Sequence, residues 1–157
     1  MKKINFKALI IAILIPLAVG GISALLTRGS MESFESINKP PLSPPAILFP
    51  IVWTILYVLM GVASYFVYTS DTAAGTKRVA LTLYGVQLFF NFFWSVLFFN
   101  FEAYLAAFVW LLMLLLLIIA TTILFYAIDK KAGYLMIPYI LWVSFAGYLN
   151  LAIYFLN

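Results

Sequence analysis

The sequence contains no cysteine and no histidine among its 157 residues. Without cysteine the chain has no disulfide and no thiol nucleophile, and without histidine it has no imidazole base. The two absences also remove the usual ligands of zinc and the two commonest protein ligands of haem iron. Any chemistry must therefore use other side chains, and we expect no metal site and no required cofactor.

Charged residues are scarce, at 9% of the chain, whereas hydrophobic residues make up 66% and the mean hydropathy is +1.13. This composition leaves too little polar surface to cover a water-soluble globule, so it indicates an integral membrane protein. The net charge of +4 comes from short clusters between apolar runs, and no basic stripe predicts binding to nucleic acid. All the acidic residues fall near segment ends, which weighs against a pump or secondary transporter: Glu32, Glu35, Asp71, Glu102 and Asp129.

Five apolar runs are each long enough to cross a hydrocarbon core of about 30 Å as a helix. We expect helices at residues 6–27, 45–69, 77–100, 103–128 and 133–155. The chain is thus predicted to be an all-α integral membrane protein, with residues 1–157 forming a single bundle of five transmembrane helices. The first run also has the basic start of a cleaved signal peptide. Its length and the lack of a clear A-x-A-like site favour a membrane helix.

Basic residues are distributed unequally between the two sides of the predicted membrane. Only Arg28 and Lys39 lie on one side, and the others lie on the amino-terminal side: Lys2, Lys3, Lys7, Lys77, Arg78, Lys130 and Lys131. Because loops rich in lysine and arginine stay in the cytoplasm, this asymmetry places the N-terminus there and residues 28–44 outside. We therefore expect a multi-pass protein of the cell membrane with a cytoplasmic N-terminus.

The connection at residues 28–44 is the one long polar segment. Residues 30–36 are predicted to form a short helix capped by Ser30. The rest is stiff, since prolines remove amide donors and hold the preceding residues extended: Pro40, Pro41, Pro44 and Pro45. A loop of this kind suits a lid over a binding site, and a rigid spacer remains the alternative.

Three of the predicted helices carry aromatic and amide side chains at helical spacing. The faces consist of Trp53 and Tyr57 in the second helix; Gln87 and Asn91 with either Trp94 or Ser95 in the third; and Tyr139, Trp142, Ala146 and Asn150 in the fifth. If these faces converge, they form a slot with flat aromatic walls, a few amides and no fixed charge. Such a slot suits a planar, mostly apolar ligand.

An alternative to ligand binding stays open for the amides of the third helix. By their chemistry alone, Gln87 and Asn91 suit hydrogen bonds that join helices in a membrane somewhat better than contacts with a ligand. Trp110, the conspicuous residue of the leucine-rich fourth helix, is expected to face lipid.

Four motifs occur in order along the chain. K-P-P-L-S-P-P begins at Lys39, and P-x-x-W-x-x-L-Y-x-x-M-G begins at Pro50. Q-L-x-x-N-x-x-W begins at Gln87, and P-Y-x-x-W-x-x-F-A-x-x-L-N begins at Pro138. Together they resemble the translocator protein family, also called the tryptophan-rich sensory protein or peripheral benzodiazepine receptor family.

The resemblance implies a five-helix bundle, often homodimeric, that binds porphyrins such as protoporphyrin IX under the first loop, between the second, third and fifth helices. The matching ligand positions are Trp53, Asn91, Trp142 and Ala146, with Tyr57 and loop prolines such as Pro44 as neighbours. Some bacterial relatives degrade porphyrin in light. Trp53 and Trp142 match the tryptophans implicated there and are the candidate catalytic residues.

This chain also departs from the family pattern. Relatives carry Trp-Tyr before the Lys-Pro motif and a Trp between the proline pairs, whereas this chain has Ser33, Phe34 and Leu42. We therefore expect the lid to have lost its gripping side chains. Nothing basic follows Tyr148 or Tyr154, so the sterol-recognition pattern is absent.

The sequence thus predicts a membrane receptor or sensor for porphyrin-like tetrapyrroles and other planar apolar ligands. The expected ligand-binding residues are Pro44, Trp53, Tyr57, Gln87, Asn91, Trp94, Trp142, Ala146 and Asn150. Light- and oxygen-dependent degradation of porphyrin, and transport of porphyrin or another small molecule, are the alternatives. The expected partners are the ligand, the lipid membrane and a second copy of the chain.

Overall fold

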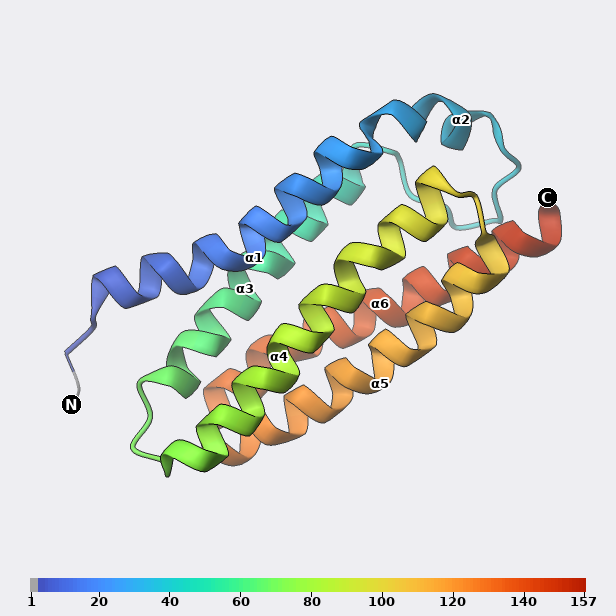
Figure 1. The fold of residues 1–157 in the computed structure, drawn as a ribbon. Helices are drawn as coiled ribbons and strands as arrows, with labels where there is room; N and C mark the ends of the chain where they lie inside the picture. The colour runs from blue at the N-terminus through green and yellow to red at the C-terminus, as the bar shows by residue number, and fades with distance from the viewer. Residues whose placement is uncertain (1–2) are drawn as a thin grey trace.

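The computed structural model describes residues 3–157, and this part of the chain is helical without a strand (Figure 1). The long helices are α1 (Phe6–Thr27), α3 (Leu48–Tyr68), α4 (Ala74–Ser95), α5 (Tyr104–Ile128) and α6 (Lys130–Leu156). A 3₁₀ turn, η1 (Arg28–Ser30), leads into the short α2 (Met31–Ser36), and a π-helical turn, η2 (Val96–Asn100), extends α4. The five segments are long and apolar enough to cross a membrane, which confirms the predicted fold class.

The helix boundaries differ from the predicted ones by a few residues, and local hydrogen bonds explain two of the differences. The second spanning helix begins at Leu48 rather than residue 45, since the chain first makes a turn in which the Leu48 amide donates to the Pro45 carbonyl at 3.0 Å. The last helix begins at Lys130 rather than residue 133, because the Asp129 side chain accepts the Lys131 amide proton at 2.9 Å. The third begins at Ala74 rather than residue 77.

The short helix predicted after the first span is present as α2, but its predicted cap is wrong. Ser30 makes no side-chain capping hydrogen bond to the α2 backbone. Its hydroxyl instead donates to the Asn100 side chain at 2.7 Å, and the Asn100 amide donates to the Leu26 carbonyl at 3.1 Å. Asn100 of η2 therefore holds both the end of α1 and the turn η1 that follows it.

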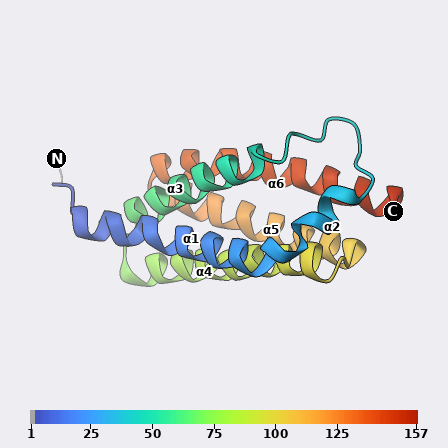
Figure 2. The same ribbon diagram turned by 90° about the horizontal axis from the view of Figure 1, so that it is seen from above.

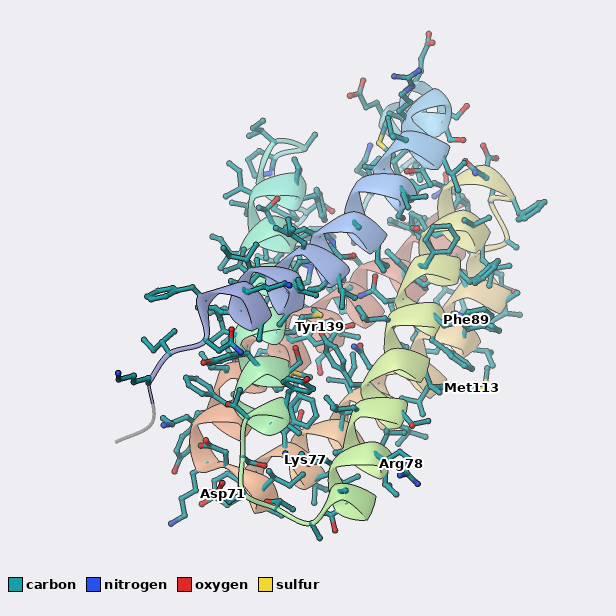
Figure 3. All side chains as sticks on the ribbon, turned by 60° about the vertical axis from the view of Figure 1, so that its left-hand side comes forward. Asp71, Lys77, Arg78, Phe89, Met113 and Tyr139 are labelled. Carbon is teal, nitrogen blue, oxygen red and sulfur yellow. The ribbon has the colours of Figure 1, made fainter. Side chains whose placement is uncertain are left out.

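The helices pack as a bundle in which α5 contacts α4 and α6, α1 contacts α3, and α3 contacts α6 (Figures 1 and 2). Gly61 is required for the α1–α3 contact, because a Cβ there would lie 2.7 Å from the Ala12 carbonyl oxygen and from the Ile13 Cα. Figure 3 shows Tyr139 inside the bundle, whereas Phe89 and Met113 lie on its outside. An apolar outer surface of this kind is suited to contact with lipid. Polar side chains therefore lie inside the bundle, where other helices supply their hydrogen-bond partners.

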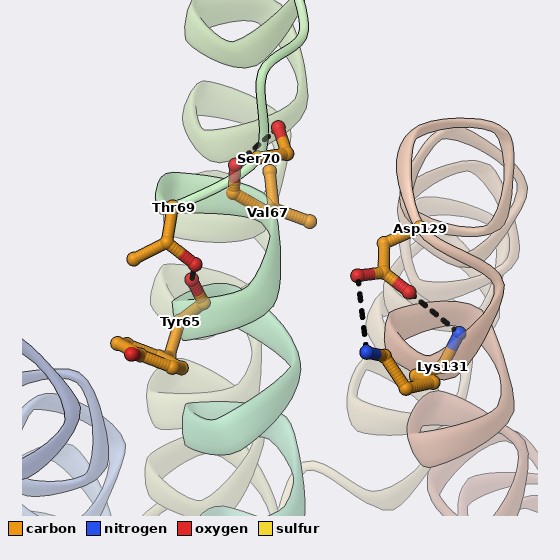
Figure 4. A network of polar contacts seen from close by, with 6 residues as sticks. All are labelled: Tyr65, Val67, Thr69, Ser70, Asp129 and Lys131. Atoms are coloured by element: carbon orange, nitrogen blue, oxygen red, sulfur yellow. Dashed lines mark hydrogen bonds and ion pairs between the residues drawn. The ribbon is translucent and has the colours of Figure 1, made fainter. Parts of the chain in front are cut away.

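The two described ends of the chain lie at opposite ends of the bundle, as an odd number of spans requires (Figure 1). At the end nearer α1's first residue, hydroxyls close the last turn of α3 (Figure 4). Thr69 donates to the Tyr65 carbonyl at 2.9 Å and Ser70 donates to the Val67 carbonyl at 2.8 Å. Asp129 and Lys131 pair at 4.0 Å on the same side.

Trp110 does not simply face lipid, and that expectation is wrong. Its indole N–H donates to the Phe90 carbonyl at 2.7 Å, and its ring stacks on the Phe90 ring with centroids 4.3 Å apart. Because a bilayer offers this donor no partner, Trp110 turns toward α4 and joins α5 to it.

Candidate ligand-binding cavity

A cavity of about 570 Å³ lies in the half of the bundle that carries α2, with walls from α1, α3, α4 and α6. Its size falls within the range of roughly 300–1,000 Å³ typical of small-molecule sites. Residues of α2 and of the segment before α3 also contribute to the lining, namely Met31, Phe34, Glu35 and Ala46. The polar connection between α1 and α3 therefore forms part of the site.

Aromatic rings form the wall shared by α3 and α6. Trp53 stacks on Tyr57 with ring centroids 5.6 Å apart, as side chains one turn apart in a helix can do. The edge of the Tyr139 ring meets Trp53 at 6.2 Å, and Trp142 meets Phe49 at 5.9 Å. The cavity thus has the aromatic faces that the sequence predicted, fixed by ring-to-ring contacts.

A chain of hydrogen bonds runs from the cavity into the core. The Tyr57 hydroxyl donates to Asn91 Oδ1 at 2.8 Å, and Asn91 Nδ2 donates to the Tyr139 hydroxyl at 2.7 Å. Tyr139 in turn donates to Gln87 Oε1 at 2.7 Å. The chain links α3, α4 and α6, and such links hold helices together where lipid supplies no hydrogen-bond partner.

Asn150 belongs to a second set of buried hydrogen bonds. Its Oδ1 accepts from the Trp94 indole N–H at 3.0 Å, and its Nδ2 donates to the Tyr104 carbonyl at 2.8 Å. Trp94 also stacks on Phe98 with centroids 5.2 Å apart. Both oxygen and nitrogen of the Asn150 amide therefore have protein partners, and its main role is to join α6 to α4 and α5.

Most of the predicted site residues meet at this cavity. Those that line it are Trp53, Tyr57, Asn91, Trp94, Trp142, Ala146 and Asn150. Gln87 and Pro44 are not among the lining residues. Gln87 is fully buried behind Tyr139, and its amide nitrogen has no hydrogen-bond partner among the described residues. One turn of α4 therefore separates an amide at the cavity, Asn91, from an amide in the core.

Sequence reasoning missed the contribution of α1. Leu17, Gly20, Gly21, Ser23, Ala24 and Thr27 all line the cavity, so α1 forms a fourth wall. Ser23 is held to Ser95 of α4 by a buried hydrogen bond between their hydroxyls. The small residues of α1 were the available signal, because small side chains leave the space that a cavity occupies.

The expectation that the lid has lost its gripping side chains is wrong for Phe34. Its ring lines the cavity and packs against Phe98 at 5.9 Å and Phe99 at 5.2 Å. Leu42 is different: it is 80% exposed, has a positive φ of 72°, and does not line the cavity. The aromatic contact of the lid thus comes from α2 rather than from the proline segment.

The rim of the cavity carries two charged residues, Arg28 and Glu35, both exposed. The helix faces considered from sequence alone gave a slot without fixed charge, so the rim is a correction supplied by the α1–α3 connection. No group of three His, Cys, Asp or Glu side chains that could hold a metal ion occurs in residues 3–157.

These features define a class: a five-helix membrane protein with an aromatic-walled internal cavity. Residues 12–156 match the sequence profile of the TspO/MBR family, and the chain belongs to that family. It is 35% identical to the tryptophan-rich protein TspO of Chlorobaculum tepidum over 99% of this chain and 98% of that protein. It is 36% identical to the TspO of Archaeoglobus fulgidus, covering 98% and 99% of the two chains. The translocator protein of Bos taurus is 34% identical over 87% of this chain and 82% of that protein.

Proposed function

We propose that this protein is a membrane receptor that binds planar, mostly apolar tetrapyrroles such as protoporphyrin IX in the cavity. The observation that carries the proposal is the presence of Trp53 and Trp142 in the lining of one cavity, with the Asn91 amide beside them. Indole faces stack on flat conjugated rings, and a single amide orients a ligand without requiring it to be charged.

The rim residue Arg28 extends the same proposal to the polar edge of the ligand. Protoporphyrin IX is an apolar macrocycle with two carboxylates on one edge, and a guanidinium is well suited to a carboxylate. With the macrocycle between the tryptophans, the carboxylates point to the cavity rim, where Arg28 lies. Glu35 at the same rim opposes this attraction, so the balance of the two charges sets the preference.

Titration with protoporphyrin IX tests the proposal directly. Tryptophan fluorescence of the protein in nanodiscs is expected to be quenched saturably. The double variant Trp53→Ala, Trp142→Ala should lose most of the affinity, whereas Trp110→Phe, which alters a tryptophan outside the cavity lining, should bind normally. Because the double variant lacks two of the fluorescent tryptophans, its affinity is also measured by isothermal titration calorimetry. Equal affinity in the double variant would refute the assignment.

A second candidate function is light- and oxygen-dependent oxidation of the bound porphyrin. It is favoured by the position of Trp53, which lines the cavity and contacts two further oxidisable rings, Tyr57 in the lining and Tyr139 behind it. Illumination of the complex in air should bleach the porphyrin absorption faster than in protein carrying Trp53→Phe and Trp142→Phe. Identical bleaching rates in the unaltered protein and the double variant would refute a catalytic role of the two tryptophans, and binding would remain the proposed function.

We further propose that the N-terminus lies in the cytoplasm and that the end of the bundle that holds the cavity and α2 lies toward the outside of a cell membrane. Lys77 and Arg78 lie at one end of the bundle (Figure 3), and Lys7, Lys130 and Lys131 lie in the first turns of α1 and α6 on the same side, as expected of a cytoplasmic end. A reporter fused to the C-terminus should be active outside the cytoplasm.

A further inference from the structure

The lining of the cavity is exposed on one side only. Seven lining residues are exposed: Gly21, Ala24, Arg28, Glu35, Ala46, Pro50 and Thr54. All of them belong to α1, to α3 or to the connection between these helices. Every lining residue contributed by α4, η2 or α6 is buried or half-buried. The cavity is therefore closed toward α4 and α6; it opens along the seam between α1 and α3, and at its rim beside the connection that joins these two helices.

The opening extends along α1 and α3, away from the helix ends next to α2 and toward the middle of the bundle. Gly21 precedes Arg28 by seven positions, which is about 10 Å of helix. On the facing helix, Thr54 follows the first residue of α3, Leu48, by six positions, or about 9 Å. The lower part of the opening is thus flanked by the apolar spans, at a depth where the surroundings are lipid rather than water.

The geometry of α1 and α3 explains why the seam is open. The two helices touch where a Cβ on Gly61 would meet the α1 backbone, and Gly20 lies against the Tyr57 ring. Beyond these contacts the helices separate toward the end that bears α2 (Figure 2). The residues that face the gap, Gly21, Ala24, Pro50 and Thr54, are too small to fill it. The close contact of α1 and α3 at Gly61 thus leaves a slit between the same two helices nearer to α2.

The water-facing side is held more firmly than the seam. The Tyr148 hydroxyl donates to the Pro41 carbonyl at 2.8 Å, and Asn157 donates to the Asn38 carbonyl at 2.8 Å. The Asn38 amide returns a bond to Asn157 Oδ1 at 3.1 Å. These contacts tie the proline segment to the end of α6. A ligand that came from water through this segment would have to break them.

We propose that the ligand enters the cavity sideways from the bilayer, through the slit between Gly21 and Ala24 of α1 and Pro50 and Thr54 of α3. This inference rests on the proposed porphyrin-binding function. A planar apolar ligand concentrates in the hydrocarbon region, so this route lets it reach the tryptophans without returning to water. On this route the proline segment need not open.

Stopped-flow quenching by protoporphyrin IX in nanodiscs tests the route with Gly21→Trp and Thr54→Trp, which narrow the slit from its two sides. A side chain at Gly21 is tolerated, because a Cβ there meets nothing within 4 Å. We expect the association and dissociation rates to fall together, each by about tenfold, so that the Kd changes far less than either rate. This differs from ordinary contact mutations, which act mostly on dissociation.

Two control variants complete the experiment. Gly85→Trp places the same side chain at an exposed α4 glycine with equally open surroundings, and its rates should match those of the unaltered protein. Tyr148→Phe releases one tie of the proline segment and should also leave the rates unchanged.

The possible outcomes separate the route from the binding function. Unchanged rates in both slit variants, faster rates in Tyr148→Phe, or a higher Kd with an unchanged association rate would each overturn the lateral route while binding itself stands. A lack of saturable quenching in the unaltered protein would instead overturn the proposed function.

Discussion

Tyr57 of α3 donates a 2.8 Å hydrogen bond to Asn91 of α4 inside the bundle, and both residues line the cavity. The same Asn91 side chain donates onward to Tyr139 of α6 at 2.7 Å. One amide therefore joins three helices at the base of the proposed binding site. Asn91 thus joins helices, the alternative that its chemistry left open, and it also lies where the proposed ligand would bind.

Removing Asn91 should destabilise the protein more than removing one of its partners. In Asn91→Leu the buried Tyr57 hydroxyl loses its acceptor and Tyr139 loses a donor, which costs about 1–3 kcal/mol for each unsatisfied group. Tyr57→Phe leaves only the Asn91 oxygen without its donor, so it incurs this cost once. Thermal unfolding in detergent measures both, with the exposed Tyr68→Phe as the control. Equal midpoints for Asn91→Leu and the control would contradict the role of the chain.

Gly61→Ala should separate α1 from α3. The added Cβ would lie 2.7 Å from backbone atoms of Ala12 and Ile13, which cannot turn away as a side chain can. We expect a loss of about 1–3 kcal/mol, in the range of overpacking. The matched control is Gly85→Ala, where the Cβ meets open space. Unfolding midpoints compare the two variants, and a midpoint for Gly61→Ala as high as that of Gly85→Ala would argue against a backbone contact.

Phe34 and Leu42 should differ in their effect on ligand affinity. Phe34→Ala removes a ring that lines the cavity and packs on Phe98 and Phe99, which we expect to cost about 1 kcal/mol, or roughly fivefold in Kd. Leu42→Ala removes an exposed side chain outside the lining and should leave the Kd unchanged. Fluorescence titration with protoporphyrin IX compares them. A larger loss of affinity in Leu42→Ala than in Phe34→Ala would show that the proline segment, rather than α2, contacts the ligand.

Arg28 should distinguish protoporphyrin IX from its uncharged dimethyl ester. Arg28→Gln is expected to weaken binding of the free acid about two- to fivefold, as for an exposed ion pair, and to leave the ester unaffected. The effect should fade at high ionic strength. Arg78→Gln, at the opposite end of the bundle (Figure 3), is the control for net charge. An equal loss for acid and ester would show that Arg28 acts through packing rather than charge.

The amino-acid pattern was enough to predict the membrane class, the five spans and the family. Long apolar runs separated by charged turns leave little choice in a bilayer, where backbone polar groups must be satisfied within each helix. It also identified the aromatic and amide faces, because residues three or four positions apart share one side of a helix. The i to i+4 spacing of Trp53 and Tyr57, for example, predicts their observed stacking.

The tertiary structure alone decided how these faces are used. Gln87 and Asn91 have the same chemistry and lie one turn apart, yet only Asn91 reaches the cavity, because helix packing covers Gln87 with Tyr139. The α1 wall, the ring of Phe34 and the rim charges likewise depend on how separate segments pack. The lateral slit follows from a contact between backbones at Gly61, and a pattern read along one helix carries no information about the distance to its neighbour.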